Sequence, residues 1–380
     1  MISGIDASNI RSGGGLTHLV ELLRASDPRE HGFERIIAWG SYMTLTQIED
    51  RPWLVKSHQP ILDRNLLYRA TWQRFQLSRL AKKAGCNVLF VPGGSYAGIF
   101  SPVVILSQNL LPFEWNELLR YGWSTTTLKW LMLRHIQSHS LRKAQGAIFL
   151  THYAQHAVLK VSGAPSGATR IIPHGIHARF FRRPREQRSM EDCTDREPFR
   201  ILYVSIIDMY KHQWHVAEAV MQLVADGLSV ALDLVGPAYP PALRRLRAAL
   251  KRLDPLGTAI RYLGPIPHRD LPQYYRGADG CVFASSCENM PNILLEMMAA
   301  GLPVACSNRG PMPEILGDAG IYFDPENLES IKRAIRQLIE SPALRARNAH
   351  AAFARSSCYS WEQCADSTFR FLADVAAGSS

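Results

Sequence analysis

The chain has 380 residues, of which 47% are hydrophobic and 20% are charged. This composition excludes a disordered or fibrous chain, and the length suits two domains of ordinary size. The net charge of +10 lies in the first half, because residues 1–180 hold 20 Lys and Arg against 10 Asp and Glu, whereas residues 181–380 hold 23 of each kind. This imbalance indicates an anionic partner, namely phospholipid, a lipid pyrophosphate or nucleic acid, or otherwise a merely basic surface.

The beginning of the chain is a short apolar stretch, residues 2–7, without the basic and then apolar layout of a secretory signal. We therefore expect a protein that is not exported, and seven cysteines without a C-x-x-C pair fit reduced thiols. Residues 84–113 carry no charge, but prolines and glycines divide them into strand-sized pieces. They predict two buried strands rather than a membrane span.

Residues 1–181 alternate short apolar strands with amphipathic helices, from a strand at 2–7 and a helix at 16–23 to a strand at 147–150. Residues 182–198 are rich in Arg, Glu and Asp and poor in apolar residues, which predicts a linker. The first domain is therefore expected to end at residue 181.

A second α/β series occupies residues 199–359. Its strands are expected at 200–204, 231–235, 260–263, 280–283, 303–306 and 321–323. An amphipathic helix follows within residues 360–380. The pattern predicts the α/β class, with two Rossmann-like doubly wound domains that bind ligands at the carboxyl ends of their strands.

The most specific segment is residues 285–304, SSCENMPNILLEMMAAGLPV. A strand ends just before it, and a helix is expected to begin near Pro291, a residue suited to the first helical position. Glu288 then lies in the preceding loop and Glu296 in the second turn. The helix N-terminus favours phosphate or sugar oxygens, and both carboxylates can accept hydrogen bonds from sugar hydroxyls. The alternative makes Glu288 a capping acid and Glu296 a solvated residue.

A glycine-rich stretch, RSGGG at residues 11–15, lies between the first strand and the first helix. Glycines let the backbone approach a ligand and point N–H groups at it. A dinucleotide fingerprint would require a glycine where His18 stands, which weakens an NAD interpretation. A plain turn is the competing interpretation.

The glutamate pair, together with EMMAAGLPV at 296–304 and GPMPE at 310–314, closely resembles family 4 of the glycosyltransferases. The resemblance implies the two-domain GT-B fold, with the last helix crossing back to the first domain. It also implies that Glu288 contacts the donor sugar, that Glu296 holds the ribose, and that Lys211 neutralises the donor diphosphate. Lys211 could otherwise be an exposed surface residue.

The resemblance implies further contacts on both sides of the reaction. Those with the donor are Ser205, the helix start at Asn289, Met290, Pro291, Asn292 and Ile293, the glycines Gly14 and Gly15, and the strand end at Gly264 and Pro265. Those on the acceptor side are Gln108, Asn109, His174 and Arg11. Family members usually carry an arginine where Ile206 stands, so the second cation is missing or supplied elsewhere, and Arg11 is a candidate. Packing explains several of these residues equally well.

The implied reaction is a retaining sugar transfer from a nucleotide-diphosphate donor, by front-face attack in which the departing phosphate accepts the acceptor's proton. A D-x-D pair and a ligand-spaced His or Cys cluster are absent from the sequence, so we expect neither a metal nor a cofactor. Residues 203–213 look most like bacterial enzymes that use GDP-mannose or GDP-rhamnose. A UDP-sugar is the alternative donor.

The first domain interleaves cations with aromatic residues, as in Arg69, Trp72 and Phe75 and again in Trp123 and Lys129. Such stretches suit docking on anionic lipid. We therefore expect a cytoplasmic enzyme at the inner face of the membrane, with a lipid-linked glycan acceptor of polysaccharide or O-antigen assembly. A nucleic-acid-binding protein and a catalytically silent sugar-nucleotide binder are the alternatives. Nucleic acid is not expected, because no recognition motif for it occurs, and the sequence indicates no particular protein partner.

Overall fold

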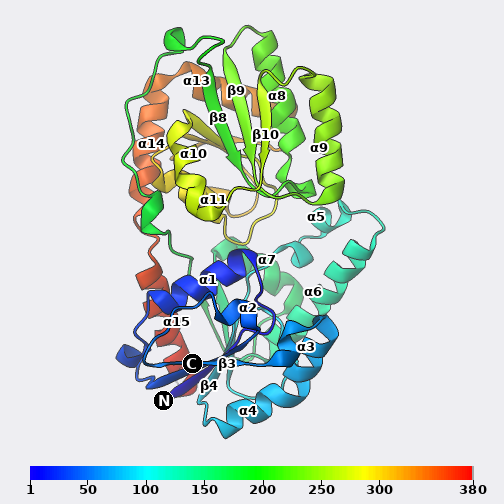
Figure 1. The fold of residues 1–380 in the computed structure, drawn as a ribbon, viewed down its shortest axis with the longest axis vertical. Coiled ribbons are helices and arrows are strands. Elements are labelled where there is room, and N and C mark those ends of the chain that lie inside the picture. Colours follow the sequence, from blue (N-terminus) through cyan, green and yellow to red (C-terminus); the bar gives the residue numbers. More distant parts are fainter. Residues whose placement is uncertain (379–380) are drawn as a thin grey trace. The chain divides into compact units, whose positions relative to one another are not determined.

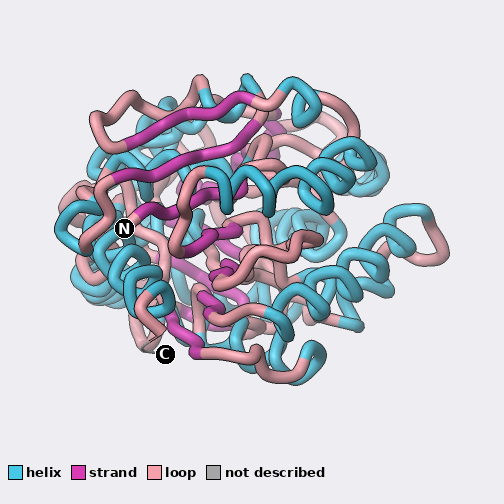
Figure 2. The backbone as a smooth tube through the Cα atoms, turned by 90° about the horizontal axis from the view of Figure 1, so that it is seen from below, coloured by secondary structure: helices cyan, strands magenta, loops and turns pink. Residues whose placement is uncertain are grey.

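The computed structural model describes residues 1–378, and the chain divides into two compact units (Figure 1). Unit 1 comprises Met1–Gly175 and the stretch that begins at Tyr359, and unit 2 comprises Ile176–Cys358. Each unit contains one sheet in which all neighbouring strands run parallel. In Figure 2 the magenta strands lie between cyan helices.

Unit 1 has a seven-stranded sheet of order β3-β2-β1-β4-β5-β6-β7. The strands are β1 (Ile2–Asp6), β2 (Arg35–Gly40), β3 (Leu54–His58), β4 (Val88–Val91), β5 (Val103–Leu106), β6 (Gly146–Phe149) and β7 (Ala168–Ile171). The central strands β4, β5 and β6 are buried at every residue, as expected for short apolar strands of a sheet covered on both faces. The uncharged stretch 84–113 thus contains two buried strands, as its prolines and glycines predict.

The helices of unit 1 include one from the end of the chain. They are α1 (Gly13–Arg24), α2 (Tyr42–Leu45), α3 (Leu66–Trp72), a π-helical turn (Gln73–Leu77), α4 (Ser78–Lys83), α5 (Trp115–Leu119), α6 (Thr125–Lys143), α7 (His152–Ser162) and α15 (Trp361–Ala376). α15 packs on β6, where a Cβ added to Gly146 would lie 3.0 Å from Val375. The expected return of the last helix to the first domain is therefore confirmed.

Unit 2 has a six-stranded sheet of order β10-β9-β8-β11-β12-β13. The strands are β8 (Phe199–Val204), β9 (Val230–Val235), β10 (Ile260–Gly264), β11 (Gly280–Phe283), β12 (Val304–Ser307) and β13 (Ile321–Phe323). The helices are α8 (Gln213–Ala225), α9 (Pro240–Leu253), α10 (Leu271–Gly277), α11 (Asn292–Ala299), α12 (Met312–Leu316), α13 (Leu328–Glu340) and α14 (Pro342–Ser356). Two parallel α/β units confirm the predicted fold class.

The strand order changes direction at one place in each sheet, between β1 and β4 in unit 1 and between β8 and β11 in unit 2. Loops that leave two such neighbouring strands diverge to opposite sides, so a crevice opens at their carboxyl ends, where ligands bind in sheets of this kind. The glycine-rich stretch follows β1, whereas Lys211 follows β8 and Glu288 follows β11.

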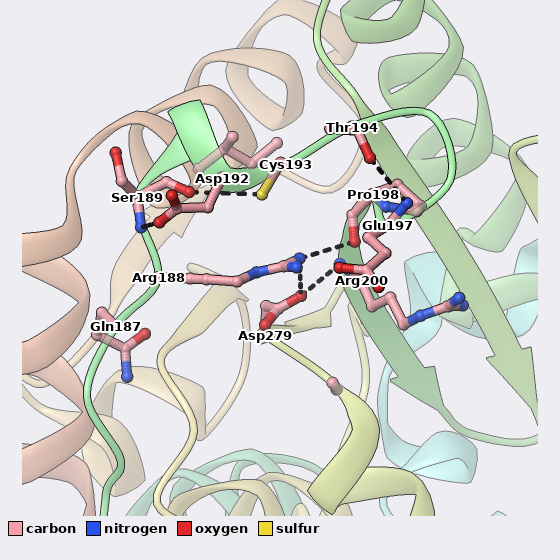
Figure 3. A network of polar contacts seen from close by, with 12 residues as sticks. Gln187, Arg188, Ser189, Asp192, Cys193, Thr194, Glu197, Pro198, Arg200 and Asp279 are labelled. Atoms are coloured by element: carbon pink, nitrogen blue, oxygen red, sulfur yellow. Dashed lines mark hydrogen bonds and ion pairs between the residues drawn. The ribbon is translucent and has the colours of Figure 1, made fainter.

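The segment 182–198, which the sequence predicts as a linker, is grouped with unit 2, which begins at Ile176. Figure 3 shows Arg188, which donates to Asp279 Oδ2 at 3.0 Å and to the carbonyl of Pro198 at 2.9 Å. Arg185 also bonds Asp279, at 2.9 Å, and the buried Arg345 donates to the carbonyl of Arg188. The arginines that indicated a linker therefore hold this segment against the rest of unit 2.

Within residues 1–378, every helix is too short or too polar to cross a bilayer.

Candidate donor-binding site

Lys211 and Glu288 form an ion pair at the point where the strand order of unit 2 reverses. Lys211 ends a short 3₁₀ turn (Met209–Lys211) after β8, and its Nζ donates to Glu288 Oε1 in the loop after β11. The side chains are only 7% and 14% exposed. The ammonium also lies 4.9 Å from the ring centre of Tyr210 and 5.2 Å from that of Phe283, so it makes cation–π contacts with both rings.

Backbone and side-chain bonds tie the two loops together. The amide of Ser286 donates to the carbonyl of Tyr210 at 2.9 Å, and the Ser286 hydroxyl lies 2.9 Å from His212 Nε2. The buried hydroxyl of Tyr203 donates to the carbonyl of Lys211 at 2.6 Å. Burial raises the pKa of Tyr203 well above its ordinary value, and the negative charge of Glu288 raises it further. Tyr203 thus stays protonated, and its hydrogen bond to the carbonyl of Lys211 helps to hold the ion pair in place.

Glu296 lies in the second turn of α11, as predicted, and is buried. His268 Nε2 is 2.6 Å from one carboxylate oxygen, and the Tyr275 hydroxyl donates to the other at 3.2 Å. Burial and then the charge of Glu296 raise the pKa of Tyr275 well above its ordinary value, so that this hydroxyl keeps its proton.

The tautomer of His268 follows from its second neighbour. Arg179 Nη2 lies 2.7 Å from His268 Nδ1, and because a guanidinium can only donate, Nδ1 must accept. The proton of the neutral ring is therefore on Nε2, which donates to Glu296. The ring also packs against Phe180, with 5.1 Å between the ring centres. Arg179, His268 and Tyr275 are site residues that the sequence analysis missed, because they lie 117, 28 and 21 residues away from Glu296 and carry no local motif.

The helix start beside the two glutamates is α11, which begins at Asn292, one residue after Pro291. Pro291 occupies the N-cap position without a side-chain hydrogen bond to the helix, and the first turn holds no acidic residue. Helix geometry leaves the first amides without intrahelical carbonyl partners, which suits an anion. Met290 and Asn289 are buried here, whereas Ile293 is half-buried.

Ser205 follows β8, whereas Gly264 ends β10 and Pro265 follows it, and β9 lies between these two strands in the sheet of unit 2. The buried Ser205 hydroxyl accepts a hydrogen bond from Gln213 at 3.1 Å and donates to the carbonyl of Ile206 at 2.7 Å. Gly264 has φ +75° and its carbonyl accepts from the amide of Gly236 at 2.9 Å. A Cβ at Gly236 would lie 2.0 Å from the carbonyl oxygen of Ser205, so this close approach of two strand ends requires glycine.

The glycine-rich stretch of unit 1 is not a loop between strand and helix, because α1 already begins at Gly13. Gly14 and Gly15 form the first turn of this helix, and a glycine at the start with φ +68° allows the chain to enter it after Ser12. A Cβ at Gly15 would lie 3.2 Å from Gln108 Oε1. The predicted donor-side Gly15 and acceptor-side Gln108 are therefore neighbours.

The other predicted acceptor-side residues of unit 1, Asn109, Arg11 and His174, each contact different neighbours. Asn109 Oδ1 accepts from the amide of Leu111 at 3.2 Å and so stabilises the turn after β5. Arg11 is exposed and donates to the carbonyl of Asp63 at 2.8 Å. His174 is buried and stacks on Trp361 of α15, with 5.5 Å between ring centres.

Comparisons with known proteins show what the chain is similar to. Residues 198–341 match the family model described as "Glycosyl transferases group 1". The O-antigen chain mannosyltransferase B of Escherichia coli is 38% identical over 109 residues, which are 29% of either chain. The glycogen synthase of Mycobacterium tuberculosis is 25% identical over 254 residues, 65% of this chain and 58% of the relative. The matches thus cover less than two thirds of these curated relatives.

Solved structures resemble the whole chain. The sucrose-phosphate synthase of Thermosynechococcus elongatus has a TM-score of 0.77 at 19% identity and covers 99% of both chains. The Anabaena protein HepE in complex with UDP-glucose has a TM-score of 0.70 at 17% identity and covers 100% of both. These likenesses establish the fold. The chain therefore has the GT-B fold, and its residues 198–341 are similar to the group 1 glycosyl transferases.

Proposed function

We propose that the chain is a retaining, metal-independent hexosyltransferase that takes its sugar from a nucleotide-diphosphate donor. The observation that carries this proposal is the arrangement of Lys211, Glu288 and Glu296 around the reversal point of the unit 2 sheet. An ammonium group has three N–H donors, so Lys211 can bond Glu288 and still reach phosphate oxygens. Glu288 offers its second oxygen to sugar hydroxyls.

Charge grows on the diphosphate as the glycosidic bond breaks. Lys211 and the amides at the start of α11 are already oriented, so they stabilise this charge more in the transition state than in the ground state. Glu296 is held by His268 and Tyr275, which orients its oxygens for the ribose hydroxyls. No metal is needed for this electrostatic contribution.

We favour a GDP-sugar donor, with mannose or rhamnose transferred to a lipid-linked glycan of bacterial polysaccharide or O-antigen assembly. The similarity to the O-antigen chain mannosyltransferase supports this choice. A UDP-sugar donor is the second candidate, because the structurally similar HepE was crystallised with UDP-glucose.

A peripheral position at the inner face of the membrane completes the proposal. Of the 18 large hydrophobic side chains that are exposed within the described residues, 14 lie in unit 1 between Tyr42 and Ile136, and unit 1 also carries the positive charge. Trp123 and Phe75 are exposed, as a docking surface requires, whereas Trp72 is fully buried and belongs to the core instead.

Calorimetric titration with GDP-mannose, GDP-rhamnose and UDP-glucose, each with and without EDTA, tests the donor. We expect micromolar to millimolar binding of a GDP-sugar that EDTA does not change, and slow donor hydrolysis that Glu288→Gln abolishes. Binding without any hydrolysis or transfer would favour a catalytically silent sugar-nucleotide binder. Binding of oligonucleotides without binding of any sugar nucleotide would favour a nucleic-acid-binding protein.

A further inference from the structure

A groove of about 840 Å³ opens in unit 1 at the amino ends of the strands, the edge of the sheet opposite to the one that holds the glycine-rich stretch. It lies between α6, the loop 96–101 and the starts of β5 and β6, at Val103 and Gln145. The π-helical turn after α3 contributes Arg74. Figure 1 shows α3 and α6 on the same flank of this unit.

The groove is strongly cationic. Its lining includes Arg74, His135, His139, Arg142 and Lys143, and no Asp or Glu lines it. The charge of Lys143, followed by burial and by the charges of Arg142 and His135, lowers the pKa of His139. A histidine whose pKa is lowered chiefly by neighbouring cations reports a positive local potential, so the groove attracts anions.

The same groove has an apolar wall and rim. Tyr96 and Phe100 are buried in its wall, and Ile99 and Ile136 at its rim are 69% and 38% exposed. Phe75, next to Arg74, is also exposed, as is Met132, one helical turn before Ile136. An aqueous anion needs only the cations. Exposed aliphatic side chains around a cationic hollow match a ligand that has a charged group and a hydrocarbon part.

We propose that this groove binds an anionic phospholipid, with the headgroup phosphate against the cations and the acyl region against the aliphatic rim. The inference rests on the proposed function insofar as a lipid-linked acceptor brings the enzyme to a membrane. It assigns the contact to a defined hollow that is separate from the donor site in unit 2. Nucleic acid would match the charge, but the lining rings of Tyr96 and Phe100 are buried and the exposed hydrophobic lining residues Ile99 and Ile136 are aliphatic, so the lining does not present an exposed Phe, Tyr or Trp ring on which bases can stack.

Sedimentation of the full-length protein with vesicles at low salt tests the proposal. We expect binding to phosphatidylcholine vesicles that contain phosphatidylglycerol and little binding to phosphatidylcholine alone. The double variant Arg142→Ala/Lys143→Ala should weaken this binding by about tenfold, since each cation near an anionic surface contributes measurably. The variant Ile99→Ser/Ile136→Ser keeps the cations but lacks the aliphatic contacts, so high salt should abolish its remaining binding to the vesicles completely.

The matched control is Arg244→Ala/Lys251→Ala, which removes the same two residue types from the exposed surface of α9 in unit 2. It should bind vesicles as the unchanged protein does. An equal loss in both double variants would overturn the proposal, because binding would then depend only on net charge. The proposal would also be overturned if a single-stranded oligonucleotide released the protein from the vesicles and if Arg142→Ala/Lys143→Ala weakened the binding of this oligonucleotide as well. Donor affinity, measured by calorimetry on each variant, reports on the proposed function separately.

Discussion

Lys211 and Glu288 form a nearly buried ion pair, and such a pair is costly to break from one side only. Lys211→Ala leaves the Glu288 carboxylate without its cation, and we expect it to lower the free energy of unfolding by up to about 3 kcal/mol. The double variant Lys211→Met/Glu288→Leu should regain most of this loss. Urea denaturation of the single and double variants measures the difference. Equal stability of Lys211→Ala and the unchanged protein would show that the pair is solvated.

The same pair decides how Glu288 should be tested for activity. Truncation to alanine would remove the hydrogen-bond acceptor of Lys211 together with the charge, so Glu288→Gln, which keeps the shape and an amide oxygen that can accept from Lys211, is the cleaner change. We expect it to lower kcat by about a hundredfold or more, as the loss of one oriented transition-state contact does in other enzymes. Its circular dichroism spectrum should remain unchanged. Wild-type turnover in this variant would remove the Glu288 charge from the mechanism.

His268 is expected to act on the donor through Glu296, as a positioning residue. His268→Ala removes one hydrogen bond to the carboxylate, and we expect donor affinity to fall by about three- to tenfold. Calorimetry with a 2′,3′-dideoxy nucleotide is the control, because a ligand without ribose hydroxyls should bind the variant and the unchanged protein alike. An equal loss with both ligands would mean that His268 acts elsewhere, and Tyr275→Phe provides an independent check on the same carboxylate.

At the scale of elements, α1 and α15 meet at a buried cluster of His18, His174 and Trp361. Burial, and then the nearby His174, lowers the pKa of His18 well below 6.5. Below pH 6.5, His18 therefore binds a proton in the unfolded chain but stays neutral in the folded chain until the pH is much lower. Stability contributed by the neutral ring is thus full above pH 6.5 and decreases as the pH falls.

The variant His18→Phe should flatten this part of the pH profile. We expect the unchanged protein to lose at most about 1.4 kcal/mol of unfolding free energy per pH unit through His18 below pH 6.5. Urea denaturation between pH 7.5 and pH 5 compares the two slopes, with His152→Phe on α7 as the control for histidine removal. Parallel slopes in His18→Phe and the unchanged protein would contradict the expected neutral state.

Elements differ in how far the sequence predicts them. The helix α11 and the placement of Glu288 and Glu296 around it could be predicted, because a strand, a turn residue and an apolar helix follow one another locally. The partners of Glu296 could not, since His268 and Tyr275 reach it only through tertiary folding. The contacts of the segment 182–198 could not be predicted for a related reason. Composition shows that its arginines are charged, but not that they bond Asp279 and main-chain carbonyls.

For the whole molecule, the contacts of α15 suggest that the two units depend on the chain end unequally. α15 buries Phe369, Phe371, Leu372 and Val375 within unit 1. The three charged donor contacts that were predicted, Lys211, Glu288 and Glu296, lie in unit 2, whereas the predicted contacts Gly14 and Gly15 lie in unit 1. A chain that stops after Cys358 should therefore lose the fold of unit 1 and keep nucleotide binding.

Calorimetric scanning of the shortened chain should show one unfolding transition instead of two, because unit 1 loses the apolar cover of β4 and β6. Deleting four large buried side chains removes several kcal/mol of hydrophobic stabilisation, comparable to the whole stability of an ordinary domain. Titration with GDP should give an affinity within about threefold of the full chain. If GDP binding disappears while the remaining transition persists, unit 1 supplies part of the nucleotide site. In that case Arg11, the candidate for the cation missing at Ile206, becomes the first residue to substitute.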